Sequence, residues 1–308
     1  MTDQIAVDSE RAALPGESVP ELALEIERPG LLRRTLWTVG LLRESPVAMI
    51  GSGLVLFWVV LALLAPWISP YDPNAQDFAA LADPTPSDKH WLGTDHLGRD
   101  LVARLLWGAR TVLTVAPLAM LSAYFVGCLM GMAAGYYGGW IDNFISRISD
   151  IILSFPVLIV YIILISSIGP SALNIIFAVT FASSPGIGRI VRGLILDLKS
   201  NEYVAAAQIR GESAFYIMAV ELLPNARGPL IVDACLRMGY TTITIGILGF
   251  LGLGLPPPDP DWGGMVKDTT ALITVWPHMS LIPSIALVTL VVGFNLLADG
   301  LREIAQRD

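Results

Sequence analysis

Charged residues are scarce in this sequence of 308 residues. Asp, Glu, Lys and Arg together make up 15%, against about 25% in an ordinary soluble domain. Four stretches contain none of them, namely 111–141, 151–188, 238–258 and 269–298. A helix needs about 20 apolar residues to cross the roughly 30 Å hydrocarbon core of a bilayer. Each stretch is that long, so the sequence predicts an integral membrane protein.

Lysine and histidine are rarer still, and their placement argues against several function classes. Lys89, Lys199 and Lys267 each follow a residue other than glycine, so the sequence has no phosphate-binding Gly-Lys-Ser/Thr motif. The three histidines show neither zinc-ligand spacing nor a Ser–His–Asp order. The net charge of −8 disfavours a nucleic-acid partner, which needs a basic face. We therefore expect a chain without catalytic, metal or cofactor sites.

Cysteine is limited to two residues, Cys128 and Cys235, both inside apolar stretches. We interpret them as small packing residues, the usual behaviour of free cysteine. The first apolar run begins near Val47, which is too late for a cleavable signal peptide, so it predicts a retained helix.

The sequence predicts an all-α membrane protein with about six transmembrane helices. The expected spans are 47–68, 111–134, 151–168, 171–189, a segment within 230–254, and 279–297. Pro156 should kink the third span. Gly127, Gly131 and Gly135 are four residues apart, a spacing that lets helices approach closely in lipid.

The distribution of Lys and Arg predicts that both termini are cytoplasmic. With that orientation most basic residues near the span ends lie inside, and the outside keeps Lys89, Arg99, Arg104, Arg110 and Lys267. The chain then divides into a cytoplasmic tail (1–46), a first span with an external loop (47–110) and a five-helix core (111–308). The core contains an internal loop at 190–227 and an external one at 255–278.

The internal loop is predicted to form a helix, a turn and a second helix. The run from Asn201 to Arg210 is rich in strong helix formers, and Gly211 is a natural helix stop. A second helical stretch, 212–223, should end at Pro224-Asn225. The small side chains of Ala205, Ala206 and Ala207 in the first helix would let another surface approach the loop closely. An ordinary loop hairpin explains the same pattern.

The external segment 90–100 contains two glycines and two aspartates, which indicate a structured turn. Arg99 lies between possible carboxylate partners. His90, Asp95 and His96 could instead form a metal site, but the glycines explain the segment without one.

Two opposite charges, Asp233 and Arg237, are one helical turn apart in the fifth span. A lone charge in mid-bilayer costs about 2.5–3.5 kcal/mol on insertion scales. We interpret the two residues as a structural ion pair; the alternatives are a place in a translocation pathway, or that both simply face water.

Four motifs resemble one family of transporters. Ala206-Ala207, Gly211 and Leu223-Pro224 are similar to the EAA loop of ABC-importer permeases, with Ala205 where that family usually has Glu. Three further segments resemble the peptide and nickel branch: Gly93-Thr94-Asp95 with Gly98-Arg99-Asp100, Gly249–Pro256 with Trp262-Gly263, and Gly293–Arg302. The sequence thus resembles the C-type membrane subunit of dipeptide, oligopeptide and nickel ABC importers.

The resemblance implies a type I permease fold in a prokaryotic inner or plasma membrane. It implies a B-type permease as heterodimer partner, two cytoplasmic ATPases that bind ATP and Mg²⁺, and an external solute-binding protein. The ATPase-coupling residues would be Glu202, Ala205, Ala206, Ala207, Gly211, Glu212, Leu223, Pro224 and Asn225. The residues on the binding-protein side would be Gly93, Thr94, Asp95, Gly98, Arg99, Asp100, Pro256, Trp262 and Gly263.

The resemblance implies import of di- or oligopeptides, with nickel or another small solute as the alternative within the same branch. A transporter driven by an ion gradient is the alternative from a different class. Such carriers usually carry midplane charges or broken helices in matching halves, and only Asp233 and Arg237 fit that pattern here.

Overall fold

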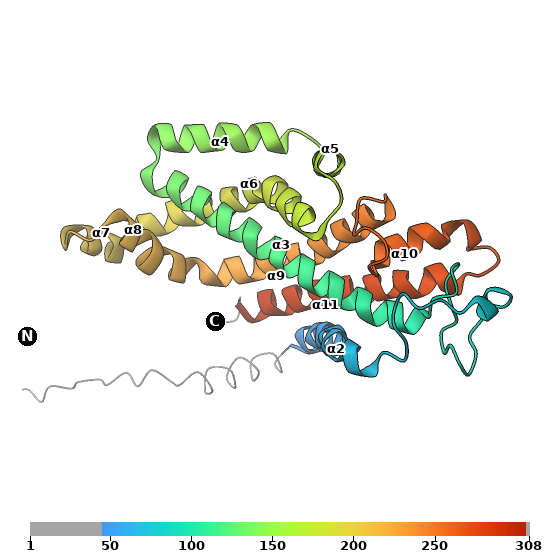
Figure 1. Ribbon diagram of the computed structural model, residues 1–308. Coiled ribbons are helices and arrows are strands. Elements are labelled where there is room, and N and C mark those ends of the chain that lie inside the picture. Colours follow the sequence, from blue (N-terminus) through green and yellow to red (C-terminus); the bar gives the residue numbers. More distant parts are fainter. Residues whose placement is uncertain (1–44, 306–308) are drawn as a thin grey trace, which may run out of the picture. The chain divides into compact units, whose positions relative to one another are not determined.

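The computed structural model describes residues 45–305, and within that range the chain is helical, with two isolated β-bridges and no strand (Figure 1). All but the last two residues of the predicted tail 1–46 lie outside the described range. The long helices are α2 (Pro46–Ile68), α3 (Leu101–Tyr137), α6 (Ala172–Lys199), α9 (Leu223–Phe250) and α11 (His278–Ala305). Shorter helices are α4 (Gly139–Leu153), α5 (Val157–Ile168), α7 (Glu202–Ile209), α8 (Ala214–Tyr216) and α10 (Trp262–Thr269).

Five helical stretches of the described chain are long and apolar enough to cross a membrane, and the bent pair α4–α5 makes up to six. The expected number of about six is therefore confirmed once the bent pair is counted. The ends of the spans differ more. The helix predicted at 111–134 begins at Leu101, because Asp100 caps it by accepting the N–H of Ala103 (2.8 Å). The predicted loop 69–110 is correspondingly shorter.

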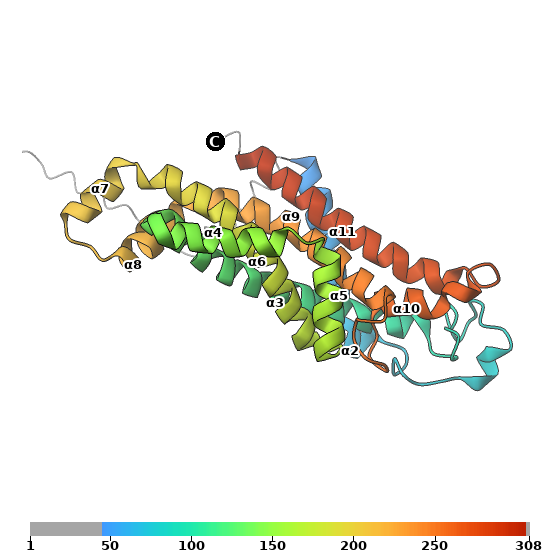
Figure 2. The same cartoon turned by 90° about the horizontal axis from the view of Figure 1, so that it is seen from above.

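A strip of glycines joins α3 to α6, as their spacing predicted. A Cβ on Gly131 would lie 2.5 Å from the carbonyl oxygen of Gly188, and one on Gly127 would lie 2.7 Å from the side chain of Ile187. Gly135 meets α6 two turns later, at Ile195. The residue numbers of the contacting positions increase in the same direction along both helices, so α3 and α6 are parallel neighbours (Figure 2). The segment between them must therefore return along the bundle.

That return is made by α4 and α5, and the single kinked span predicted at 151–168 is instead a pair of separate helices. The two helices are inclined by 85° to each other, and the break lies at Ser154–Pro156. Pro156 precedes the first turn of α5, so it separates two helices rather than kinking one. α4 runs along α6 and is held by Asp142–Arg192 (2.5 Å) and Asp150–Arg189 (2.5 Å). Because α4 carries these charged residues, the search for stretches without charged residues did not identify it as part of a span.

The internal loop also differs from its prediction at one end. The second helix does not stop at Pro224-Asn225, because α8, the wider-turned π-helical segment Ile217–Leu222 and α9 form one continuous helical stretch to Phe250. Pro224 lies in the first turn of α9 directly after the π turn, where its missing N–H leaves no regular hydrogen bond unmade.

Helices α2 and α11 pack along their length and bring the two ends of the described chain together. A Cβ on Gly300 would lie 2.4 Å from the side chain of Ala48, so the backbones are in close contact there. The Ser45 hydroxyl donates to the Glu303 carboxylate (2.8 Å). We call this end of the bundle, which also carries α7 and α8, the α7 end. The opposite end, with residues 69–100 and α10, is the α10 end (Figure 1).

Candidate functional site

The turn between α7 and α8 is fixed by Gly211. Its φ of +78° is a conformation that only glycine adopts readily. The N–H of Gly211 donates to the carbonyl of Gln208 (3.0 Å), and that of Glu212 donates to the carbonyl of Ala207 (3.2 Å). Both bonds satisfy carbonyls that the end of a helix leaves unpaired. The predicted helix stop at Gly211 is confirmed.

One face of α7 packs on the bundle and the other is open. Val204 and Ala207 are fully buried against a cluster that includes Ile195, Ile217 and Leu222. Ala205 and Ala206 point outward. Beyond them two large apolar side chains stand free, Ile209 with 88% and Phe215 with 74% of its surface exposed. An exposed apolar tip of this kind is typical of a protein contact surface.

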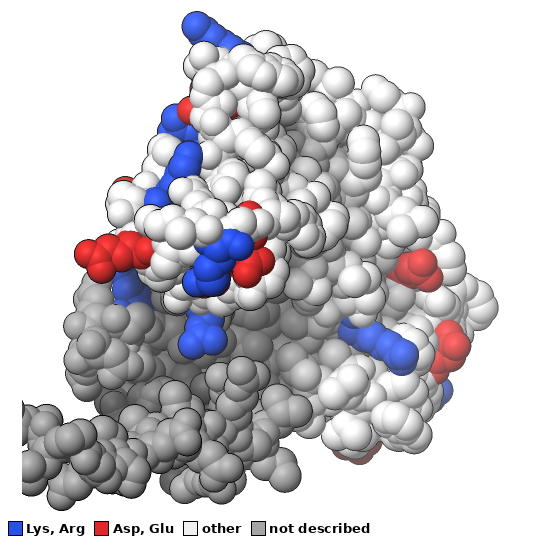
Figure 3. Space-filling view, turned by 90° about the vertical axis from the view of Figure 1, so that its left-hand side faces the viewer, with Lys and Arg blue, Asp and Glu red and all other residues white. Residues whose placement is uncertain are grey.

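Three charged residues beside the tip, Arg210, Glu212 and Glu221, pair with one another. The Arg210 guanidinium lies 3.2 Å from the Glu221 carboxylate and 3.7 Å from that of Glu212. Seen from the α7 end, basic and acidic side chains lie close together near the centre, and further charged side chains lie to either side of them (Figure 3). Ala205, where the resemblance led us to expect a glutamate, places a small neutral side chain on this exposed surface.

Most of the predicted coupling residues are accessible. Exposed positions are Glu202, Ala205, Ala206, Gly211, Pro224 and Asn225; Glu212 and Leu223 are half-buried, and Ala207 is buried. Sequence reasoning missed Ile209 and Phe215, the most exposed apolar residues of the tip. A signal was available in the sequence. Both are large apolar residues close to the helix stop at Gly211, in a loop that has basic residues at both ends.

The α10 end is organised by Asp95. Its Oδ1 accepts the backbone N–H groups of Leu97 (2.9 Å) and Arg99 (3.0 Å), and its Oδ2 faces the side chains of Arg99 (2.7 Å) and Arg104 (3.4 Å). All three charged side chains are at least nine-tenths buried. Arg104 also donates to the carbonyl of Pro73 (3.2 Å). A buried carboxylate with this many donors fixes the loop on the start of α3.

His90 belongs to the same scaffold. Its Nδ1 lies 2.9 Å from Asp100, the cap of α3, and its Nε2 lies 3.4 Å from Asp77. The Lys89 ammonium lies 2.5 Å from the same Oδ2 of Asp77 and, together with His90, lowers the pKa of that carboxyl to about 2. The open metal-site alternative placed Asp95 with His90, but Asp95 directs both oxygens to arginines and backbone donors. His90 therefore serves to join the loop to α3.

Trp262 anchors α10 in the bundle. It is fully buried, it donates from its indole N–H to the carbonyl of Leu105 (3.0 Å), and it packs edge-on against Trp58. Gly108 leaves the space it occupies, because a Cβ there would lie 2.5 Å from its ring. Asp261 caps the same helix, and burial raises the pKa of its carboxyl to about 6 although the N–H groups of Gly263 and Gly264 oppose the shift.

The predicted residues of the binding-protein side are brought together at the α10 end, but only Pro256 is exposed. The other eight are buried: Gly93, Thr94, Asp95, Gly98, Arg99, Asp100, Trp262 and Gly263. Direct contact of these eight with a partner does not fit their burial, so the motif builds the loops rather than their surface. The most exposed large apolar side chains of these loops are Trp91 (71%) and Phe78 (72%), which the sequence analysis did not single out.

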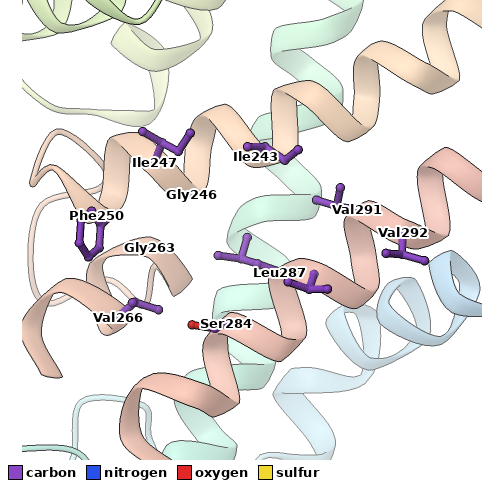
Figure 4. A pocket seen from close by; sticks show the side chains of 11 residues that line it. Ile243, Gly246, Ile247, Phe250, Gly263, Val266, Ser284, Leu287, Val291 and Val292 are labelled. Atoms are coloured by element: carbon purple, nitrogen blue, oxygen red, sulfur yellow. The ribbon is translucent and has the colours of Figure 1, made fainter. Parts of the chain in front are cut away.

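An apolar cavity of about 380 Å³ opens between α9, α10 and α11 (Figure 4). Ile243 and Ile247 of α9 face Leu287 and Val291 of α11 across it, and Val266 closes the α10 side. Such a cavity can accept an aliphatic group but offers no charge.

The ion pair expected inside the fifth span is present. The Arg237 Nε lies 2.7 Å from Asp233 Oδ2, and the hydroxyl of Tyr124 on α3 donates to the same oxygen. Both charged side chains are partly exposed, 26% for Arg237 and 20% for Asp233.

Comparisons with known proteins cover most of the chain. Residues 123–308 match the family described as "Binding-protein-dependent transport system inner membrane component". Residues 35–84 match the "N-terminal TM domain of oligopeptide transport permease C".

Curated relatives agree with these matches over most of their own length. A dipeptide transport system permease protein of Alkalihalophilus pseudofirmus is 36% identical over 262 residues, which cover 85% of this chain and 86% of the relative. A glutathione transport system permease protein of Pectobacterium atrosepticum is 37% identical over 258 residues, 83% of this chain and 85% of the relative. The corresponding protein of Escherichia coli O157:H7 is 37% identical over 262 residues, with 85% and 86% covered.

Proposed function

Because the chain belongs to the family of binding-protein-dependent transport system inner membrane components, we propose that it is the C-type permease of a peptide importer. Its solutes are di- or oligopeptides, including small peptides of the size of glutathione, as the names of its relatives suggest. It works as a heterodimer with a B-type permease, on two ATPases, with an external solute-binding protein. ATP and Mg²⁺ bind to the ATPases.

The α7 tip carries this proposal. Ala205 and Ala206 let another backbone come close, and Ile209 and Phe215 stand exposed beside them. Burying one large apolar side chain contributes about 1.5–3 kcal/mol. A partner with two apolar hollows would therefore gain several kcal/mol by closing on the tip. Through α8 and the π-helical segment the tip continues into α9, so its movement reaches the membrane-spanning part directly.

The α7 end is accordingly cytoplasmic and the α10 end external. Arg189, Arg192, Lys199 and Arg210 lie at or near the α7 end, in agreement with the rule that positive residues stay inside. Both termini then lie inside. The α10 end offers Trp91 and Phe78 to the binding protein. ATP on one side and the loaded binding protein on the other bias two conformations of similar free energy.

Reconstitution tests the function. Proteoliposomes with both permeases, both ATPases and the binding protein should accumulate a labelled di- or oligopeptide only when ATP is present. Omission of ATP or of the binding protein should reduce accumulation to background. Peptide uptake by this chain alone on a proton or sodium gradient would contradict the proposal, and ATP-driven uptake of Ni²⁺ but not of peptides would replace its substrate.

A further inference from the structure

A polar cluster lies halfway along the membrane-spanning part of the bundle. Asp233 and Arg237 occupy the middle of α9, and Tyr124 reaches them from α3. Asp233 Oδ2 accepts from both neighbours, so the carboxylate holds the guanidinium at Nε and is itself held by the phenol. The three side chains fix one another's orientation across two helices.

The outer edge of the guanidinium is left open. An arginine has five N–H donors, and among the described residues only Nε of Arg237 has an acceptor. Nη1 and Nη2 lie beside Gly186 of α6, at 3.6 and 3.8 Å from the position that a Cβ would take there, which is ordinary van der Waals distance. A quarter of the Arg237 side chain is exposed.

Neutral polar groups continue the cluster on the α6 side. Ser183 lies one turn before Gly186 and shares a hydrogen bond with the hydroxyl of Tyr161 on α5 (3.2 Å). Ionisable residues inside membrane spans face the protein interior or a water-filled path, since lipid cannot solvate them. Replacing a buried ion pair by apolar side chains of similar volume is often neutral or stabilising, so stability alone is a weak reason for a pair at this position. The open fork of Arg237 therefore points to a ligand.

We propose that Arg237 is a binding residue of the translocation pathway that receives a carboxylate of the solute through Nη1 and Nη2. Asp233 and Tyr124 are positioning residues that turn the fork outward. The inference rests on the proposed function, because a linear peptide with a free C-terminus always brings a carboxylate, and an arginine fork matches a carboxylate with two parallel hydrogen bonds. Asp233 already neutralises the arginine, which keeps the contact weak enough for the solute to leave.

Uptake by three complexes tests the proposal against a purely structural ion pair. Arg237→Gln should lower ATP-driven uptake of a free-acid peptide about tenfold or more, the usual cost of a charge-assisted hydrogen bond. The double variant Asp233→Asn with Arg237→Gln restores a neutral hydrogen-bonded pair and should remain equally low. Recovery of the double variant to within about twofold of the wild type, at equal assembly, would reduce the pair to a structural role and overturn the proposal.

Accessibility gives a second readout that does not depend on uptake. With Cys128 and Cys235 replaced by Ser, Arg237→Cys in the assembled complex should react with an anionic, membrane-impermeant thiol reagent. Saturating peptide with its binding protein and ATP should slow that reaction about fivefold or more. Phe125→Cys, next to Tyr124 on the exposed apolar side of α3, is the matched control and should stay unlabelled.

Absence of labelling at position 237 in every nucleotide state would overturn the inference. The two failures remain distinguishable. If the wild-type complex moves no peptide at all, the proposed function is wrong, whereas normal peptide uptake together with an unreactive position 237 refutes only the role of Arg237.

Discussion

Single glycines decide how closely the helices of this permease approach. Gly131 has no room for a side chain, because a Cβ would meet the Gly188 carbonyl oxygen and the side chain of Val191, both at 2.5 Å. Gly193 on α6 has nothing within 4 Å of the corresponding position. The two residues differ in packing although both are glycines in long helices. Only the first holds two helices together.

We expect Gly131→Val to destabilise the complex by about 1–3 kcal/mol, the usual cost of forcing extra volume into a packed interior. Gly193→Val should stay within about 0.5 kcal/mol of the wild type. Thermal unfolding of the purified complex in detergent, followed for both variants in parallel, measures the difference. Equal melting of the two variants would mean that α3 and α6 are not in close contact at Gly131.

At the scale of the element, the turn after α7 makes a sharper prediction. No neighbouring atom lies within 4 Å of a Cβ built on Gly211, so a substitution there is strained only by the backbone φ of +78°. The left-handed conformation costs a residue with a Cβ about 1 kcal/mol. Gly211→Val should therefore leave the chain inserted and expressed but reshape the tip, and so weaken ATPase association.

ATPase assays on the whole complex, with and without the binding protein, measure this effect. Gln208→Glu, exposed on the same tip, keeps helix propensity and should be milder. Full stimulated ATPase activity and full uptake in Gly211→Val would exclude the α7 tip as the coupling element.

The sequence predicted best those features that are set by residues close to one another in the chain. The start of α2, the stop at Gly211 and the Asp233–Arg237 pair depend on neighbouring residues, and each is confirmed. The start of α3 was missed because Arg104 and Arg110 lie inside the helix, where a charge-free window cannot include them. Arg104 is tolerated only because Asp95 and Pro73 meet it from a distant loop.

Burial at the predicted sites was beyond the sequence for the same reason. The sequence of the motif 93–100 is compatible with an exposed contact surface and with a buried structural loop, because glycine and aspartate are common in both. Its scaffold role follows from Asp77 and Pro84, whose carbonyl oxygens occupy the space that a Cβ on Gly98 or Gly93 would need. Contacts between residues so far apart in the chain are not encoded in any local pattern.

At the scale of the whole molecule, the position of the chain's two ends makes the topology testable. Ser45 and Glu303 are in contact, so the start of α2 and the end of α11 lie at the same end of the bundle. Residues 83 and 268 lie in exposed positions at the opposite, α10 end. An even number of crossings follows, with α4–α5 counted as one.

Cysteine reporters check both the number and the direction. After replacement of Cys128 and Cys235, Asp83→Cys and Asp268→Cys should react with an impermeant thiol reagent added outside intact cells, and Glu212→Cys should react only after the cells are opened. Labelling of Glu212→Cys from outside would reverse the orientation.

The bent pair α4–α5 has a consequence for the order of synthesis. α5 has 12 residues and is about 18 Å long, too short to cross a bilayer unaided. Asp150 and Asp142 of α4 find their arginines only 39 and 50 residues later in the chain. While the ribosome is still translating α6, α5 is therefore too short to cross the bilayer and the aspartates of α4 are not yet neutralised by their arginines, so the two helices cannot settle in lipid. We expect α4 and α5 to wait in the translocon or at the membrane surface and to enter together with α6, so that insertion proceeds by a helix group at this point rather than helix by helix.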